Sequence, residues 1–146
     1  MSSTRMTIQG IDSLVDKLET MGRAGKTAAN KALREAGAVI VKQQQIDGPR
    51  HKGGPANGKN KHGADALKVG KIRTAKASKN KYVQIGITDR EVWEYAKGVY
   101  FQHHGFYNHR TKRYVAGSQW FNKSFEKSKN TAASILKKAL ERELKL

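Results

Sequence analysis

The chain has 146 residues, with 29 lysines and arginines against 12 aspartates and glutamates, so its formal charge is +17. It contains no cysteine, which excludes a disulfide framework, a zinc site with thiolate ligands and a cysteine nucleophile. The longest uninterrupted apolar run, Ala38–Val41, is far shorter than the ~20 residues of a transmembrane helix, and no secretory signal is recognisable. We therefore expect a soluble, strongly basic, intracellular protein.

The first third of the chain changes from strand-like to helix-like spacing. Residues 4–9 alternate apolar and polar side chains, which predicts a short strand. Residues 11–22 have apolar side chains at helical spacing, which predicts an amphipathic helix that begins near Asp12 and ends at Gly22. A second helix is predicted from about Gly25 to Gln45. Its apolar stripe is rich in small residues, which would let another element approach closely: Ala28, Ala29, Ala32, Leu33, Ala36, Val39 and Ile40.

The positive charge is concentrated in residues 47–81, which hold ten basic and two acidic residues. Both prolines of the protein, Pro49 and Pro55, and many of its glycines lie in the first half of this segment. Glycine, proline and repelling lysines all oppose regular, compact structure. We therefore predict a long, mobile basic arm over residues 47–66.

The remaining elements are predicted from apolar spacing. Weak alternation over residues 67–73 and clear alternation over residues 82–87 predict two strands. Residues 91–104 are rich in aromatic side chains and fit either a helix or a strand, and residues 105–117 fit a loop or a hairpin. A long helix is predicted from Ser118, which would serve as its N-cap. Its expected buried face comprises Phe121, Phe125, Ala132, Ile135, Leu136, Ala139 and Leu140.

Together these elements predict a single α+β domain over residues 1–146. We expect a small, mainly antiparallel sheet packed by two N-terminal helices and a long C-terminal helix, with a long basic loop.

The five histidines do not form a recognisable metal site. His103 and His104 are adjacent, so on a strand they would point to opposite faces, and no acidic residue falls between Glu94 and Glu126. The run from His103 to Arg110 superficially resembles a nuclease motif, but polar or interface histidines beside a glycine turn are favoured. No phosphate-binding loop, hydrolase or metalloprotease motif is present, and no carboxylate pair suggests acid–base catalysis. We expect no enzymatic activity, metal or cofactor.

Two groups of residues are candidates for binding. The basic group would contact duplex DNA through its phosphates, or an acidic protein partner: Arg50, Lys52, Lys59, Lys61, Lys68, Lys71, Arg73, Lys76, Lys79 and Lys81. Few aromatic residues accompany it, which disfavours base stacking on single strands. The aromatic group would form the core or a subunit interface: Trp93, Tyr95, Tyr100, Phe101, Trp120, Phe121 and Phe125.

Several segments follow one another in the order found in a known family. Met6–Met21 combines a short strand with a helix similar to a GLDEL motif, and Ala32–Ile40 reads ALREAGAVI, close to an ALREAG motif. Pro49 matches a proline that in the family precedes a TG-L motif. In this chain a lysine–glycine arm stands in place of that TG-L motif. Val83–Gly86 matches a short strand ending in glycine.

Two later segments continue the series. The stretch ending Gln102–Gly105 is similar to a YA-x-x-VEFGT motif, with His103 where glutamate is usual, and Gln119–Glu126 resembles a PFLRPAFE motif without its prolines. In this order, the segments resemble the tail-completion or head–tail joining proteins of long-tailed bacteriophages, the gene-product-ten-like family of lambda-type phages.

The resemblance implies a structural virion protein of the phage neck, made in the host cytoplasm, that joins the head connector to the tail. Identical copies would form a ring, with six favoured and twelve the alternative, around the path of the packaged double-stranded DNA. Neighbouring neck and tail-tube proteins would be its partners, and no membrane would be involved. The alternatives are a freestanding, sequence-independent nucleic-acid-binding protein and a small metal-dependent nuclease that uses His103 or His109.

Overall fold

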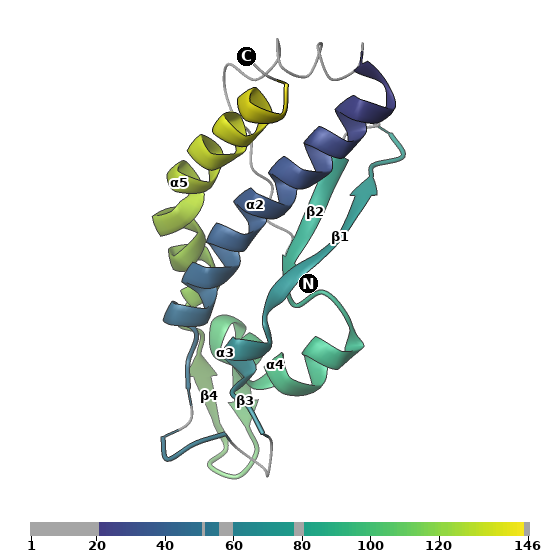
Figure 1. Cartoon of the computed structure of the whole chain (residues 1–146). Coiled ribbons are helices and arrows are strands. Elements are labelled where there is room, and N and C mark those ends of the chain that lie inside the picture. Colours follow the sequence, from purple (N-terminus) through teal and green to yellow (C-terminus); the bar gives the residue numbers. More distant parts are fainter. Residues whose placement is uncertain (1–20, 51, 56–59, 78–80, 145–146) are drawn as a thin grey trace.

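The computed structural model describes residues 21–50, 52–55, 60–77 and 81–144 (Figure 1). The elements in chain order are α2 (Arg23–Asp47), α3 (Gly63–Ala66), β1 (Lys68–Thr74), β2 (Lys81–Gly86), α4 (Arg90–His104), β3 (Gly105–Asn108), β4 (Arg113–Ala116) and α5 (Trp120–Glu143). The α+β class is confirmed, with the strands paired antiparallel in two separate hairpins, β1–β2 and β3–β4. The strand predicted over residues 4–9 lies outside the described residues, as does most of the helix predicted over residues 11–22.

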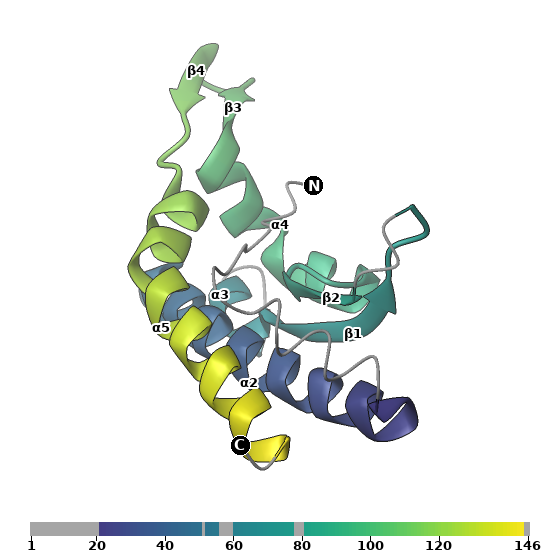
Figure 2. The same ribbon diagram turned by 90° about the horizontal axis from the view of Figure 1, so that it is seen from above.

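Helices α2 and α5 lie side by side along most of their length (Figures 1 and 2). Small side chains on both helices make up much of their contact, as the stripe on the second predicted helix indicated. The buried residues of this contact are Ala32, Ala36, Ile40, Ala132, Leu136, Ala139 and Leu140. Two ion pairs, Glu35 with Arg142 at 2.6 Å and Asp47 with Lys127 at 3.4 Å, show that the two helices run antiparallel.

The β1–β2 hairpin packs on another face of α2. Its two strands cross α2 at Gly37, where an added Cβ would lie 3.3 Å from the Ile85 side chain and 3.5 Å from that of Val69. The absence of a side chain at Gly37 therefore sets how closely the hairpin approaches. The strand register shifts between Val69 and Ile72, and Lys81 Nζ ties the hairpin to α2 by donating to Asn30 Oδ1 at 2.7 Å.

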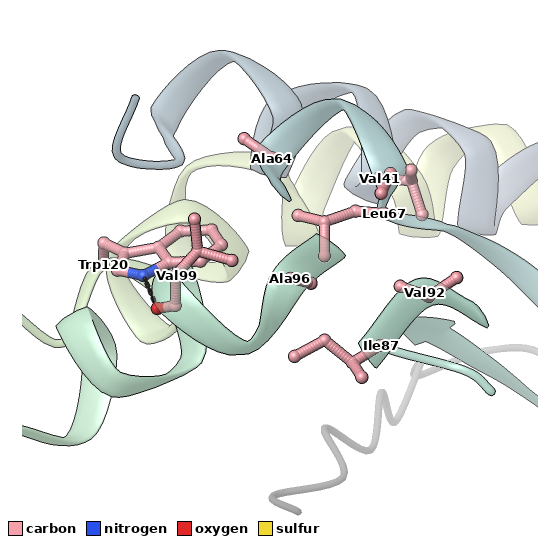
Figure 3. Close-up of a cluster of buried hydrophobic side chains, with 9 residues drawn as sticks. Val41, Ala64, Leu67, Ile87, Val92, Ala96, Val99 and Trp120 are labelled. Carbon is pink, nitrogen blue, oxygen red and sulfur yellow. Dashed lines mark hydrogen bonds between the residues drawn. The ribbon is translucent and has the colours of Figure 1, made fainter. Parts of the chain in front are cut away.

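A second core cluster joins α3, α4 and the start of α5 to α2 (Figure 3). Leu67 is 1% exposed and lies among side chains from all these parts of the chain, including Val41 and Ala96. Ala64 is fully buried on α3, so the predicted mobile arm over residues 47–66 extends too far. Its last residues form a short helix whose alanines belong to the core. The segment of residues 63–67, with two alanines and a leucine as its apolar residues, is too short for its spacing to predict that helix.

The junction between α4 and α5 satisfies the backbone carbonyls that end α4. The carbonyl of Gln102 accepts hydrogen bonds from the N–H and hydroxyl of Ser118, and that of His103 accepts from the N–H and side-chain amide of Gln119. One turn earlier, Trp120 Nε1 donates to the carbonyl of Val99 at 2.8 Å (Figure 3). Because the last carbonyls of a helix have no partner within it, this segment fastens the two helices together.

The start of α5 differs from the prediction. Gln119, not Ser118, occupies the N-cap position, in a left-handed conformation and without a capping hydrogen bond from its side chain. The free N–H of Phe121 instead donates to Nδ1 of His103 at 3.1 Å. Ser118 does not cap α5 because its hydroxyl donates instead to the carbonyl of Gln102 at the end of α4.

The β3–β4 hairpin extends away from the helices in both views (Figures 1 and 2). Every residue of β4 is exposed, as is Tyr107 on β3. Gly105, at its base, has a φ of +90°, and a Cβ there would lie 2.6 Å from the Tyr114 hydroxyl. A glycine is therefore required where α4 turns directly into β3.

Candidate nucleic-acid interface

The ten basic residues expected to face a partner do not form one uniform surface. Lys59 and Lys79 lie outside the described residues. The other eight divide into four that contact another side chain of this protein and four for which the structure gives no partner among the described residues. The former are Arg50, Lys61, Lys68 and Lys81, and the latter are Lys52, Lys71, Arg73 and Lys76.

Arg50 closes the base of the basic loop. Its guanidinium donates two hydrogen bonds to the Asp65 carboxylate, both at 2.7 Å, and a third to the carbonyl of Gln45. The hydrogen bonds from Arg50 hold the pKa of Asp65 below its usual value. Because the guanidinium is already used in this way, Arg50 holds the two ends of the loop together rather than presenting a free charge to a partner.

Lys68 and Lys61 are also engaged. Lys68 Nζ lies 2.8 Å from Asp89, the residue whose other carboxylate oxygen caps α4 by accepting from the N–H of Val92. Lys61 Nζ lies 4.6 Å from the centre of the Tyr95 ring, in a cation–π contact. These positions still contribute positive potential, but their geometry is set by the protein itself.

Lys71, Arg73 and Lys76 are exposed on β1 and in the turn after it, and Lys52 is exposed in the basic loop. On β1, the apolar side chains of Val69 and Ile72 are half-buried, whereas the cations stay in solvent. This is the part of the predicted basic group that the structure leaves available to an external anion.

The acidic residues explain why these cations have no internal partner. Within the described ranges the chain has nine aspartates and glutamates, and seven of them already form salt bridges: Glu35, Asp47, Asp65, Asp89, Glu94, Glu126 and Glu143. Only Glu91 and Glu141 among those nine are without one. The same ranges contain 24 lysines and arginines, so most of their positive charge has no acidic partner among the described residues.

A further group of cations was not singled out from the sequence. Arg110, Lys112 and Arg113 lie exposed in and beside the turn of the β3–β4 hairpin. The sequence did carry a signal for them, because they fall in the long interval without acidic residues between Glu94 and Glu126. The predicted basic group was confined to the lysine-rich segment of residues 47–81 and therefore did not include these three residues.

The aromatic residues separate into core and surface. Trp120 is 5% exposed and belongs to the core, and Phe121 and Phe125 are half-buried beside it on α5. On α4, Phe101 is 44% exposed, and its ring meets those of Trp93 and Tyr100 edge-on. The half-buried residues of the group are Trp93, Tyr95, Tyr100, Phe121 and Phe125.

His103 and His104 lie on the last turn of α4, so residues 91–104 form the helix rather than the strand. Their rings meet edge-on with centres 4.5 Å apart, and they therefore do not point to opposite faces as they would on a strand. His103 is 3% exposed, and burial, together with the charge of His104, lowers its pKa. A neutral ring whose Nδ1 accepts the N–H of Phe121 has its other nitrogen protonated.

Two other features bear on the nature of the site. Within the described part of the chain, histidine, aspartate and glutamate side chains nowhere gather in a group of three that could hold a metal ion. In that same part, none of the helices combines the length and apolar character needed to cross a membrane.

Comparisons with models of protein families, with curated proteins and with solved structures return no match to this chain.

Proposed function

We propose that this protein is a structural subunit of the neck of a long-tailed bacteriophage, where identical copies form a ring around the DNA path and join head to tail. The ordered series of motifs that resemble the tail-completion family supports this role. In the structure, the ALREAG-like motif lies within α2, the glycine-ending motif forms most of β2, and the last motif begins α5.

The observation that carries the DNA-facing part of the proposal is the surplus of described cations without partners among the described residues. Seven of the nine described acidic residues are already paired, so the described part of a second copy offers few free carboxylates to neutralise Lys71, Arg73 and Lys76. The neutralising groups therefore come from outside, and DNA phosphates in the neck channel supply them. Around a ring these charges add, which makes a strong field in a narrow passage.

The proposal is tested by imaging phage particles that lack this protein. Separate, filled heads and finished tails are the expected result, and intact virions would contradict a joining role. Lys71→Gln, Arg73→Gln and Lys76→Gln together should leave joining intact and impair DNA retention or ejection. A matched control replaces Lys123, Lys137 and Lys138, which are exposed on α5, and should have a smaller effect.

The second candidate, a freestanding nucleic-acid-binding protein, is favoured by the same unpaired cations and requires no ring. Native mass spectrometry of the purified chain, with and without duplex DNA, separates the two. Six- or twelve-fold assemblies support the neck role, whereas tight duplex binding by a monomer that never assembles supports the alternative. Lysines that contact phosphates carry no base information, so either protein would bind duplexes of different sequence equally.

A further inference from the structure

We propose that the β3–β4 hairpin is a second contact for duplex DNA, in which the cations at its tip bind the phosphate backbone. The three tip cations are Arg110, Lys112 and Arg113, and the whole hairpin, Gly105–Ala116, contains no acidic residue. The inference concerns this surface alone and holds for a neck subunit and for a freestanding binder.

The shape of the hairpin fits an external partner. It extends beyond the helices (Figures 1 and 2), β4 is exposed throughout, and its free end lies at the opposite end of the molecule from the last residues of β1 (Figure 1). A two-stranded hairpin with so little burial gains little stability from the protein core. Two-stranded β-ribbons are narrow enough to enter a groove of duplex DNA.

The turn is held in a fixed conformation that presents the cations. The side chain of Asn108 accepts hydrogen bonds from the N–H groups of Arg110 and Thr111, at 3.0 and 3.3 Å. Lys112 has a φ of +56°, a left-handed conformation that glycine or asparagine adopts at less cost. Lys112 therefore places a positive charge at the tip, between two arginines, at the cost of a less favourable backbone conformation.

The same charges argue against a second copy of the chain as the partner. Arg113 lies on the exposed strand β4 and opposes pairing with β4 of another copy, because like charges would face each other. In addition, Glu91 and Glu141 are the only described acidic residues without a salt bridge, so the described part of another copy has little negative charge to offer.

Exposed aromatic side chains add a hydrogen-bond donor to the cations of the hairpin. Tyr107 and Tyr114 are cross-strand partners on one face of the hairpin and are 50% and 66% exposed. The ring of His109 packs edge-on against Tyr107 with centres 4.9 Å apart. The Tyr107 hydroxyl provides a donor for phosphate or sugar oxygens along a strand of the duplex, whereas the Tyr114 hydroxyl donates to the carbonyl of His104 at 3.4 Å.

The test measures binding of the full chain to a fluorescently labelled duplex of mixed sequence over a series of salt concentrations. Arg110→Gln, Lys112→Gln and Arg113→Gln together should weaken binding about tenfold or more at low salt. They should also lower the logarithmic salt slope by about 1 per lost contact, or about 3 in all. The control triple Lys123→Gln, Lys137→Gln and Lys138→Gln removes the same charge from α5. Thermal melting of both triples checks that each remains folded.

A single variant separates charge from conformation. Lys112→Gly removes one cation and relieves the left-handed conformation, so it should raise the melting temperature slightly and still lower the salt slope by about 1. An increase in stability with no change in DNA binding would mean that Lys112 is not a contact and would count against the proposal.

Three results would overturn the inference. The wild-type chain could fail to bind duplex at low salt, or the two triples could weaken binding equally, which would show a general charge effect. Alternatively, the hairpin triple could keep duplex binding and lose binding to poly-aspartate, which would assign the hairpin to an acidic protein. Loss of duplex binding in the hairpin triple does not depend on ring assembly, so it is distinguishable from failure of the proposed neck function.

Discussion

Replacing His103 tests the junction between α4 and α5 most directly. The ring is buried against Trp120 and Phe121, and its Nδ1 accepts the N–H of Phe121 at 3.1 Å. His103→Leu places an apolar side chain of similar size in the same position and removes the acceptor. His103→Asn keeps an acceptor close to the position of Nδ1 but cannot become protonated near neutral pH.

The expected cost of His103→Leu follows from the lost cap. Loss of a helix cap costs about 0.5–2 kcal/mol, and a buried donor left without a partner costs about 1–3 kcal/mol. These figures describe the same N–H, so they are not added, and we expect about 1–2 kcal/mol. For a domain of this size that corresponds to a decrease of roughly 2–8 °C in the melting temperature.

The pH dependence gives a sharper test than the size of the loss. Burial lowers the pKa of His103 below its ordinary value of 6.5 in the folded protein, so as pH falls the unfolded chain takes up a proton first. The stability contributed by the neutral ring is therefore complete above about pH 6.5 and is lost as pH falls toward the lower, folded pKa. Below the folded pKa the loss stops growing. The slope between the two values is at most about 1.4 kcal/mol per pH unit.

Urea unfolding from pH 7.5 to 5 of the wild type and of His103→Asn measures this contribution by difference. The wild type should lose stability relative to the variant as pH falls, and His109→Asn, which alters an exposed histidine on the hairpin, should leave that slope unchanged. Parallel curves for the wild type and His103→Asn would refute a buried, neutral His103 that caps α5.

Three further predictions concern packing, backbone geometry and charge. Leu136→Ala, in the buried α2–α5 contact, should cost about 2–5 kcal/mol in denaturant unfolding, and Phe125→Ala should cost less because its ring is half-buried; equal losses would contradict this packing. Gly105→Ala should reduce amide protection of the hairpin in hydrogen exchange, because φ is +90° there. Arg50→Met should cost under about 1 kcal/mol, since the pair with Asp65 is exposed. Because that pair lowers the pKa of Asp65, its part of the difference should begin to decrease below about pH 4 and be lost as pH falls through the lowered pKa of the folded protein.

The elements with clear apolar spacing were predictable from the sequence. The second predicted helix, from about Gly25 to Gln45, corresponds to α2, and the strand predicted over residues 82–87 corresponds to β2. In both, the spacing of the apolar side chains matches one kind of element, and these side chains pack against another part of the fold. Residues 91–104 fitted two patterns because the aromatic side chains of α4 are only half-buried or, as with Phe101, exposed, and its buried face consists of smaller residues and His103.

Features that depend on contacts between distant residues could not be predicted in this way. The cap of α5 comes from His103, 18 residues before Phe121, whereas local rules look only at the residues next to the helix start. The burial of Ala64 likewise depends on α2 and α4 meeting around α3, and nothing in a short glycine–alanine segment indicates that.

The positive charge of the candidate site was predictable from the sequence, but its position was not. The reason is that the acidic residues determine which cations are available. Counting charges along the chain identifies a basic segment, but whether a given cation is available depends on which carboxylates the fold brings to it. Asp65 and Asp89 engage Arg50 and Lys68, two of the cations that the sequence assigned to a partner. The short hairpin interval around Arg110 has no such carboxylate in its own sequence, so its smaller charge remains available. In a strongly basic chain, the few acids therefore determine which part of the positive surface can bind.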